Sequence, residues 1–506
     1  MENKQVVICV NGIEQRVNPG VYLSEILQEM KDFRMPCAGH GRCGKCKVLA
    51  QGMLSEPKEQ EQNYLTKKEL ESGIRLACQT KVLGPCHISL IQEETIDVLL
   101  EKATIHPTLE NTKLMFQKLG VAVDIGTTTL ALSLHNEYGL VGQVGAINPQ
   151  VVFGADVISR IEHSLNGKGE QLAKAVQSGI ADLLEQVCQK YGHHVEEIDT
   201  LVITGNTVML YLLMKKYPKS LSFAPFQADW LAGQWVEARD LFLGCRNAKV
   251  YLPYCISAFV GADITMALLH TNICRDKKKR LLVDIGTNGE VALWTGEKLL
   301  CCSTAAGPAF EGTGLTMGMT ASTGAISKVC LEEDTFYVQV IGNQEPIGIC
   351  GSGVIDAVSC LLQSEIMDET GYLEEEEIIL AGNVKITQED IRKIQLAKSA
   401  ICAGIEAVLH QEGINIEELD ELLIAGGFGS KIDLENAMKI GLLPQMDRNK
   451  IKVCGNSALA GAELLLHHCE LLEKQKELLQ MSQSFDLATN SFFQEKYIEG
   501  MLFYDK

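Results

Sequence analysis

Alternating apolar and polar residues at the start of the chain predict a β-hairpin. Residues 5–10 form an apolar strand, Asn11-Gly12 is a tight-turn signal, and residues 13–17 form the returning strand. Residues 21–30 then carry apolar side chains at helical spacing, which predicts an amphipathic helix. The chain is therefore expected to open with a hairpin and a helix, ahead of a glycine-rich loop.

A second pattern begins at Gly120 and returns later in the chain. Val-Asp-Ile-Gly-Thr fills positions 123–127 and again 283–287, each time at the end of an apolar strand and the start of a turn. Between the copies lie a helical stretch, 170–191, and a strand with its turn, 201–207. Strands that alternate with helices indicate α/β architecture. The repeat predicts two related halves that face one another.

Composition indicates which partners the protein does not bind and in which compartment it works. A net charge of −20 argues against nucleic acid and against an anionic membrane surface as partners. The 18 cysteines are scattered through apolar runs, which suits a reducing cytosol better than a disulfide framework. The start of the chain has no signal-like segment, and no apolar run reaches membrane-spanning length. A cytoplasmic protein of several domains is expected.

Four cysteines near the N-terminus carry the most specific chemical signal. Cys37, Cys43 and Cys46 lie in the glycine-rich loop with C-x5-C-x2-C spacing, and Cys78 follows after a long gap. Zinc usually takes two C-x2-C-like pairs, so this arrangement favours a [2Fe–2S] cluster over zinc. The first spacing is one residue longer than in plant-type ferredoxins and resembles that of adrenodoxin-like ferredoxins. The four cysteines are the predicted metal ligands, and Cys86 is interpreted as a spare thiol.

The repeated strand–turn units are suited to hold phosphate groups. Asp124 and Asp284 come at the strand ends, where a Mg²⁺ ion and its waters would lie, and they are the predicted catalytic pair. Turn amides and threonine hydroxyls would bond phosphate oxygens, and a later glycine-rich strand end would pass under an adenosine. No GxxxxGK[ST] motif occurs, so this is not a P-loop enzyme. The predicted nucleotide contacts are Gly126, Thr127, Thr128, Thr129, Gly286, Thr287, Asn288, Gly289, Gly426, Gly427 and Gly429.

Taken in order, these three motifs resemble the phosphate-1, phosphate-2 and adenosine motifs of the acetate and sugar kinase/Hsp70/actin superfamily. Residues 351–358 and 458–462 resemble its small-residue connecting helices. The hairpin, helix, cysteine loop and late cysteine of residues 1–95 resemble a [2Fe–2S] ferredoxin. Joined in one chain, the two parts resemble the ATP-dependent reductive activators of corrinoid proteins over about residues 5–480.

This resemblance implies a fold, a reaction and its cofactors. The fold is an N-terminal β-grasp ferredoxin domain followed by two duplicated ribonuclease-H-like α/β halves. The reaction is the ATP-dependent, one-electron reduction of an inactive Co(II) corrinoid to Co(I), in a methyltransferase or demethylase system of anaerobes. The implied cofactors are a [2Fe–2S] cluster, ATP and Mg²⁺. The implied partners are a corrinoid-binding methyl-carrier protein, an upstream low-potential electron donor and a second copy of the chain.

The same patterns divide the chain into segments. We expect a ferredoxin domain (1–95), a linker (96–118), the first ATPase half (119–277), the second half (278–481) and a C-terminal tail (482–506). One long helix is expected from residue 457 to about residue 481. Longer members of the family carry a middle domain before the ATPase. Because Gly120 follows the linker directly, that domain is expected to be absent and the chain to be of a compact type.

Other functions stay open at this point. A small-molecule kinase with an attached redox domain would need an acceptor pocket and a base. A nucleotide-gated ferredoxin would dock a partner without reducing it. An activator of a 2-hydroxyacyl-CoA dehydratase relies on its own subunit-bridging [4Fe–4S] cluster, and the N-terminal ferredoxin-like domain argues against that reading.

Several further residues receive structural interpretations. Asp156 and Asp263 share a Gly-Ala-Asp setting, in which helix capping is favoured over a role as a general base. Cys301, Cys302 and Cys350 are expected to pack in the core rather than to hold a second cluster. Neither group is therefore assigned to the predicted site.

Overall fold

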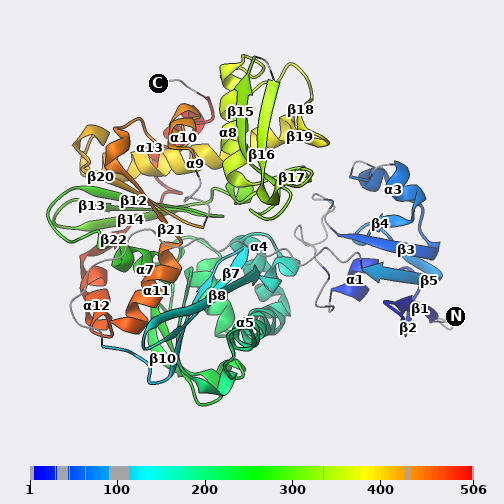
Figure 1. The fold of residues 1–506 in the computed structure, drawn as a ribbon, viewed down its shortest axis with the longest axis horizontal. Helices are drawn as coiled ribbons and strands as arrows, with labels where there is room; N and C mark the ends of the chain where they lie inside the picture. The colour runs from blue at the N-terminus through cyan, green and yellow to red at the C-terminus, as the bar shows by residue number, and fades with distance from the viewer. Residues whose placement is uncertain are drawn as a thin grey trace. The chain divides into compact units, whose positions relative to one another are not determined.

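The computed structural model describes residues 5–28, 30, 33, 44, 46–62, 64–65, 67–90, 113–333, 335–427 and 432–503. The chain divides into two compact units, drawn in Figure 1. The first comprises residues 1–96 and 149–163, and the second comprises 97–148 and 164–506. Among the predicted site residues, Cys37, Cys43 and Gly429 lie outside the described residues, as does most of the expected linker.

The first unit is built on a five-stranded mixed sheet with strand order β2-β1-β5-β3-β4. The predicted hairpin is confirmed, because β1 and β2 pair antiparallel and turn through Asn11 and Gly12, both with positive φ. Helix α1 is shorter than predicted, and it begins only at Leu23 because Tyr22 pairs with Lys81 in an isolated bridge. The elements are β1 (Val6–Val10), β2 (Ile13–Val17), α1 (Leu23–Leu27), β3 (Lys47–Leu54), α2 (Glu59–Gln62), α3 (Lys67–Glu71), β4 (Ile74–Leu76) and β5 (Val82–Leu90).

Residues 149–163 add a 3₁₀ turn, η1 (Pro149–Phe153), and helix α4 (Val157–His163) to this unit. Asp156 precedes α4 and accepts hydrogen bonds from the backbone N–H and the hydroxyl of Ser159, both at 2.8 Å. These bonds satisfy a free donor of the first helical turn. The capping interpretation of Asp156 is therefore confirmed.

A buried carboxylate fixes the turn that carries Cys78. Glu61, in α2, is fully buried, and its two oxygens accept from Arg75 Nε at 3.0 Å and Nη2 at 2.8 Å. Glu61 Oε1 also accepts from the Leu76 N–H at 3.0 Å and the Thr80 hydroxyl at 3.2 Å. Burial alone would raise the pKa of Glu61, but the bonds from Arg75 and the backbone hold it below its usual value. The carboxylate thus anchors the chain on both sides of Cys78.

The second unit consists of two halves with the same core topology, as the repeat predicted. The sheet orders are β10-β11-β9-β6-β7-β8 and β21-β20-β12-β13-β14-β22. Each half has an antiparallel meander, β6-β7-β8 or β12-β13-β14, flanked by two parallel strands, β9 and β11 or β20 and β21. The strands are β6 (Leu119–Ile125), β7 (Thr129–Asn136), β8 (Gly139–Ile147), β9 (Ile198–Gly205), β10 (Ala232–Glu237), β11 (Lys249–Tyr254), β12 (Arg280–Ile285), β13 (Gly289–Trp294), β14 (Leu299–Thr304), β20 (Glu421–Ala425), β21 (Ile451–Gly455) and β22 (Ser482–Ser484).

Helices surround both sheets (Figure 1). The longest in each half, α5 (Gly169–Tyr191) and α9 (Gln388–Glu412), precede the parallel strands β9 and β20. The others are α6 (Thr207–Leu213), α7 (Ala262–Thr271), α8 (Gly351–Gln363), α10 (Leu434–Lys439), α11 (Ser457–His467), α12 (Leu471–Met481) and α13 (Ser491–Glu499). Two small sheets belong to the second half: β15 (Ala325–Glu332), β16 (Thr335–Val340) and β17 (Gly348–Ile349), then β18 (Glu377–Ala381) and β19 (Val384–Thr387).

Helices α7 and α11 join the two halves at a close crossing. A Cβ atom at Gly461, in α11, would lie 2.1 Å from the Met266 carbonyl oxygen of α7. Only glycine allows this backbone approach. One apolar core contains residues from both sheets and both helices, among them Ala122, Met266 and Leu423. The small residues of 458–462 therefore serve the contact between the halves.

The long helix predicted from residue 457 to about 481 is broken in the structure. Helix α11 ends at His467, and His468 leaves the helical conformation with φ −138 and ψ 75. The N–H of Cys469 then donates to the carbonyl of Lys113 at 2.9 Å, before α12 begins at Leu471. A bond to a distant segment therefore interrupts a stretch whose local sequence is helical throughout.

The C-terminal residues are not a separate tail, in contrast to the prediction for 482–506. Strand β22 pairs with β14, and α13 precedes a segment held by the fully buried Lys398. The Lys398 ammonium donates to the carbonyls of Gly500 and Leu502 at 2.6 and 2.7 Å. The described end of the chain is thus part of the second half.

Within the described ranges, no helix is both long enough and apolar enough to cross a bilayer. The described cysteines form no disulfide with one another. Cys301 and Cys302, adjacent in β14, are buried in different cores, as expected of neighbours in a strand. Cys86 is buried in the core of the first unit.

We predict that Glu61→Gln destabilises the first unit by about 3 kcal/mol, because the Arg75 charge then stays buried without its carboxylate. The measurement is the urea midpoint of the visible absorbance of the [2Fe–2S] cluster that the sequence predicts for this unit. Glu69→Gln is the control, since it breaks a partly exposed pair with Lys47, 2.7 Å apart, and should cost less than about 1 kcal/mol. Equal midpoints in the two variants would contradict the anchoring role of Glu61.

Candidate functional site

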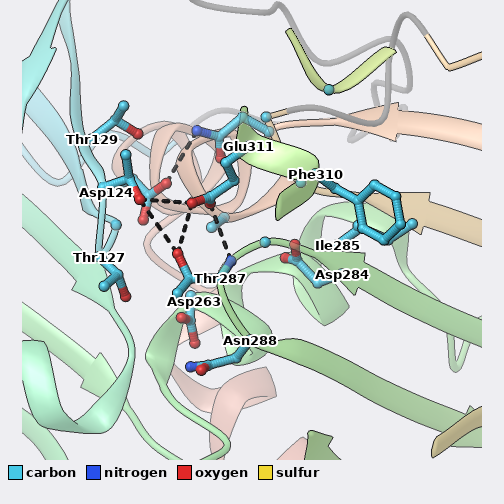
Figure 2. A pocket seen from close by; sticks show the side chains of 18 of the residues that line it. Asp124, Thr127, Thr129, Asp263, Asp284, Ile285, Thr287, Asn288, Phe310 and Glu311 are labelled. Atoms are coloured by element: carbon cyan, nitrogen blue, oxygen red, sulfur yellow. Dashed lines mark hydrogen bonds between the residues drawn. The ribbon is translucent and has the colours of Figure 1, made fainter. Parts of the chain in front are cut away.

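A cavity of about 200 Å³ lies in the second unit, where the β6–β7 and β12–β13 turns approach each other. Figure 2 shows side chains of both turns around it. Gly351 and Ser352, at the start of α8, form part of its wall, as does Cys350, which is also buried. The predicted residues that line the cavity are Asp124, Gly126, Thr127, Thr128, Thr129, Asp284, Gly286, Thr287, Asn288, Gly426 and Gly427.

Two of the predicted glycines, Gly289 and Gly426, lie where the chain packs too closely for a side chain. Gly289 does not line the cavity: it begins β13, where a Cβ atom would lie 2.8 Å from Thr304 Oγ1 and 2.9 Å from Ile401 Cγ1. Close packing thus accounts for that glycine. Gly426 has a φ of +103, and a Cβ atom there would lie 2.5 Å from the Ile285 carbonyl oxygen. Its backbone therefore passes directly over the end of β12.

Four carboxyl groups meet at the cavity: Glu290 is buried, Asp124, Asp263 and Asp284 are half-buried, and several of them raise the pKa of a neighbour. Burial raises the pKa of Asp124 to about 6. Burial, and to a smaller extent the charges of Asp124 and Glu311, raise the pKa of Asp284 to about 7. Burial, and to a smaller extent the charges of Asp284 and Asp124, raise the pKa of Asp263 to about 8. The pKa of Glu290 is raised well above its usual value by burial and by Asp263 and Asp284. A bound cation would lower all of these pKa values.

Asp263 is a cavity residue, which the capping interpretation did not foresee. Gly261 occupies the N-cap position of α7, and Asp263 lies in the first turn, where its Oδ1 accepts from the Ile264 N–H at 2.8 Å. Figure 2 shows the Asp263 side chain near Thr287 and Asn288. The capping interpretation of Asp263 was therefore wrong.

Two asparagines that the sequence analysis missed fix residues of the first turn. Asn206 caps α6 and directs its Nδ2 to the Thr127 hydroxyl at 3.4 Å. Asn456 caps α11 and donates from Nδ2 to Asp124 Oδ2 at 3.1 Å. Both follow the end of a buried strand in the sequence, which is a readable N-cap signal. The α11 cap thus links Asp124 of the first half to the second half.

Glu311 is another residue that the sequence analysis missed. It ends a 3₁₀ turn, η6 (Pro308–Glu311), and its Oε2 accepts from the hydroxyls of Thr128 at 2.6 Å and Thr287 at 2.7 Å. Its Oε1 accepts from the Thr287 N–H at 3.1 Å. Figure 2 shows these bonds converging on the carboxylate. One side chain thus connects the two repeated turns.

The second predicted site lies in the first unit. Cys46 precedes β3 and Cys78 follows β4, and their sulfur atoms lie 3.3 Å apart without forming a disulfide. The Ala77 N–H donates to the Cys46 carbonyl at 2.9 Å, and the Gln79 Nε2 approaches the Cys78 sulfur at 3.6 Å. Two buried thiols that converge from distant segments are a donor set suited to iron or zinc. The residues present therefore fit half of the predicted ligand set.

The two units together define the class of this protein. It joins a ferredoxin-like domain to a domain of two similar halves, of the type that binds nucleotides. Family models support this division. The 2Fe-2S iron-sulfur cluster binding domain matches residues 6–83. The RACo middle region matches residues 119–276, and the C-terminal domain of RACo, described as the ASKHA domain, matches residues 278–506.

Individual relatives extend over most of the chain. The corrinoid activation enzyme RamQ of Eubacterium limosum is 35% identical over 76% of this chain and 70% of its own length. The [Co(II) methylated amine-specific corrinoid protein] reductase of Methanosarcina barkeri is 26% identical over 75% of this chain and 76% of its own. A solved reductive activator for corrinoid, iron-sulfur protein is 27% identical, with a TM-score of 0.73 and 98% of each chain covered. The chain belongs to the RACo family.

These matches confirm the ferredoxin-like domain and the ASKHA fold, and they correct one prediction. The chain does not lack the middle region of the family, because that model matches residues 119–276. These are the residues that the sequence analysis assigned to the first ATPase half. The expectation of a compact type without that region was therefore wrong.

We predict that the second unit loses thermal stability as the pH rises from about 5 to about 8.5 in the presence of a chelator. The free carboxyl of an aspartate titrates at 3.8, whereas Asp124, Asp284 and Asp263 titrate at about 6, 7 and 8 in the folded protein. The folded state therefore binds more protons over this range, and raising the pH favours unfolding. Tryptophan fluorescence reports this unit alone, because it contains all three tryptophans: Trp230, Trp235 and Trp294.

Asp284→Asn removes one of these groups and should flatten the dependence of the melting temperature on pH. Asp420→Asn is the matched control: it lies at the surface and should keep the wild-type slope. Parallel curves for the wild type and Asp284→Asn would show that the buried carboxyls do not set the pH dependence.

Proposed function

We propose that this chain is an ATP-dependent reductive activator that returns an inactive Co(II) corrinoid protein to Co(I). The observation that carries the proposal is the presence, in one RACo-family chain, of a [2Fe–2S]-type domain and a cavity between two duplicated halves. Relatives named for corrinoid activation and for reduction of a Co(II) corrinoid protein align with 76% and 75% of the chain. The proposed substrate is a corrinoid-binding methyl-carrier protein.

The reaction needs an energy source. Co(I) is a strong reductant, and each ~59 mV of an uphill one-electron step costs about 1.4 kcal/mol. A nucleotide can help only by binding one state of the protein more tightly than another. The two halves, joined at α7 and α11, would provide two such states, one open and one closed. We expect nucleotide binding to favour closure, and closure to favour a complex in which Co(II) has lost a ligand and is easier to reduce.

The nucleotide would be held by residues from both halves. Asp124 and Asp284 would bind Mg²⁺ through its waters, since Mg²⁺ usually keeps several waters beside one or two carboxylates. The hydroxyls of Thr127, Thr128 and Thr287 and the turn amides would donate to phosphate oxygens. The backbone at Gly426 and Gly427 would lie under the nucleoside. When bound, Mg-ATP supplies the free energy of its hydrolysis.

The electron would reach the corrinoid from the first unit. Cys46 and Cys78, together with Cys37 and Cys43, would hold the cluster. When bound, a [2Fe–2S] cluster supplies one electron at a time. The Gln79 amide, 3.6 Å from the Cys78 sulfur, is positioned to influence its potential. An upstream low-potential donor would reduce this cluster again.

We also propose that the chain divides into a ferredoxin domain, a linker and two ATPase halves. A ferredoxin domain within 1–95, a linker over 96–118 and ATPase halves that meet near residue 277 are supported by family matches at 6–83, 119–276 and 278–506. The second half would extend beyond residue 481. The described cysteines form no disulfide with one another, which suits a reducing compartment such as the cytoplasm. The family resemblance also implies a homodimer.

We predict that Co(I) forms only when Mg-ATP is present. The experiment mixes the anaerobic, reduced protein with a Co(II) corrinoid methyl carrier and follows the Co(I) absorbance band with and without Mg-ATP. Asp124→Asn should slow Co(I) formation about tenfold or more, because it removes a carboxylate from the proposed Mg²⁺ site. Asp240→Asn, which changes an exposed aspartate of the same half, is the control and should keep the wild-type rate.

The outcomes separate the candidate functions. Equal Co(I) formation without nucleotide would contradict the energy coupling. ATP turnover and a reducible cluster, without Co(I) from any of several carriers, would contradict activation and favour a kinase. The cluster spectrum of Asp124→Asn must match that of the wild type, so that any loss is traced to the nucleotide site.

A further inference from the structure

The Glu311 carboxylate holds donors that a nucleotide phosphate would need. The Thr128 hydroxyl comes from the first half, and the Thr287 hydroxyl and N–H come from the second. All three donate to Glu311, and the two threonine hydroxyls lie 3.4 Å apart. An anionic oxygen at this position is thus already bonded to both repeated turns.

A carboxylate and a phosphate group cannot both occupy this position. Each is an anion that accepts hydrogen bonds, and each would use the same hydroxyl and amide donors. The cavity already carries several acidic groups. The charge of Glu311 helps to raise the pKa of Asp284, after the effects of burial and of the Asp124 charge. A phosphate that enters between the turns therefore has to replace Glu311.

The segment that carries Glu311 is short and belongs to no sheet, and Phe310 within it is buried in the core of the second half, so the Glu311 side chain is the part free to change position. It is the 3₁₀ turn η6, which lies between Gly307 and Gly312, both with positive φ, 78 and 71. Its backbone contacts with the repeated turns include the Gly307 N–H, which donates to the Thr287 carbonyl at 2.8 Å. The carboxylate of Glu311 adds the connection to Thr128 of the opposite half.

The direction in which a nucleotide would lie across the cavity determines which of its phosphates reaches the donors held by Glu311. The backbone expected to lie under the nucleoside, at Gly426, belongs to the second half and lies against Asp284. Thr128 belongs to the first half. A phosphate chain that starts near Gly426 and crosses the cavity reaches donors from both halves with its last phosphate.

We propose that Glu311 is a specificity-determining residue that occupies the position of the terminal phosphate and is replaced by it when a nucleoside triphosphate binds. This inference rests on the proposed nucleotide site. A diphosphate leaves Glu311 bonded to both turns, whereas a triphosphate has to displace it. The separation of the Glu311 carboxylate from the two turns therefore depends on the third phosphate.

The test compares Glu311→Gln with the wild type in the full-length, cluster-loaded protein. The affinities for ADP and for a non-hydrolysable ATP analogue are measured by calorimetry with Mg²⁺ present. A neutral amide bonds the threonines more weakly and does not repel phosphate, so Glu311→Gln should bind the analogue about tenfold more tightly. Its affinity for ADP should stay within about twofold of the wild-type value. Glu297→Gln, a surface carboxylate of the same half, is the control and should change neither affinity.

The possible results are distinct. Unchanged or weaker binding of the analogue, or an equal gain for both nucleotides, would overturn the exchange while leaving the nucleotide site intact. If the wild type binds neither nucleotide, the proposed site itself is wrong and the exchange is wrong with it.

A measurement on the wild type does not depend on the folding of a variant. Amide hydrogen exchange should become slower in the two turns, 126–129 and 286–289, when the ATP analogue binds. It should become faster in 308–313, because η6 has lost the Glu311 contact. Protection of 308–313 together with the turns would overturn the proposal.

Discussion

The structure depends on the meeting of two acidic strand ends in one cavity. Asp124 and Asp284 occupy equivalent positions in β6 and β12, both are half-buried, and burial is the largest cause of the raised pKa of each. Buried carboxylates without positive partners are costly, and the raised pKa values of this group express that cost. A site of this kind is suited to receive a cation with a polyanion. The glycine crossing of α7 and α11 keeps the two strand ends facing each other.

Because the cavity is divided between two halves, a ligand that binds there also acts on their relative position. Thr128 and Thr287 donate to the same carboxylate oxygen, so the turns already share one anionic partner. A nucleotide that replaces this partner differs from it in size and charge, and it would favour a different spacing of the halves. ATP binding can thereby be coupled to a partner protein without any contact between nucleotide and corrinoid.

Much of this site could be predicted from the sequence, because the decisive residues lie in a repeated pentapeptide. The structure brings the strand ends at Asp124 and Asp284, the threonine turns and Gly426 together around one cavity. Glu311 was missed because it lies in a 3₁₀ turn without periodicity and reaches Thr128 only through the tertiary fold. Asn206 and Asn456 were also missed, although their positions after buried strands were readable as helix caps.

The fold shows the same division between local and long-range causes. The hairpin of the first unit and the duplicated sheets follow from local alternation and from the repeat. The break between α11 and α12 does not, because it depends on a bond from Cys469 to Lys113, far away in the sequence. The middle region of the family was misjudged for another reason. Residues 119–276 were assigned to an ATPase half, and periodicity alone does not tell which region of a family such a segment represents.

The central claim is that one nucleotide is held by both halves at once, and a double-mutant cycle tests it most directly. The affinity for a non-hydrolysable ATP analogue is measured by calorimetry for the wild type, Thr128→Val, Thr287→Val and the double variant. If one phosphate bonds both hydroxyls, the losses should be non-additive, with a coupling energy of about 1 kcal/mol. Additivity within about 0.3 kcal/mol would show that the two turns do not share a ligand, and it would contradict the account.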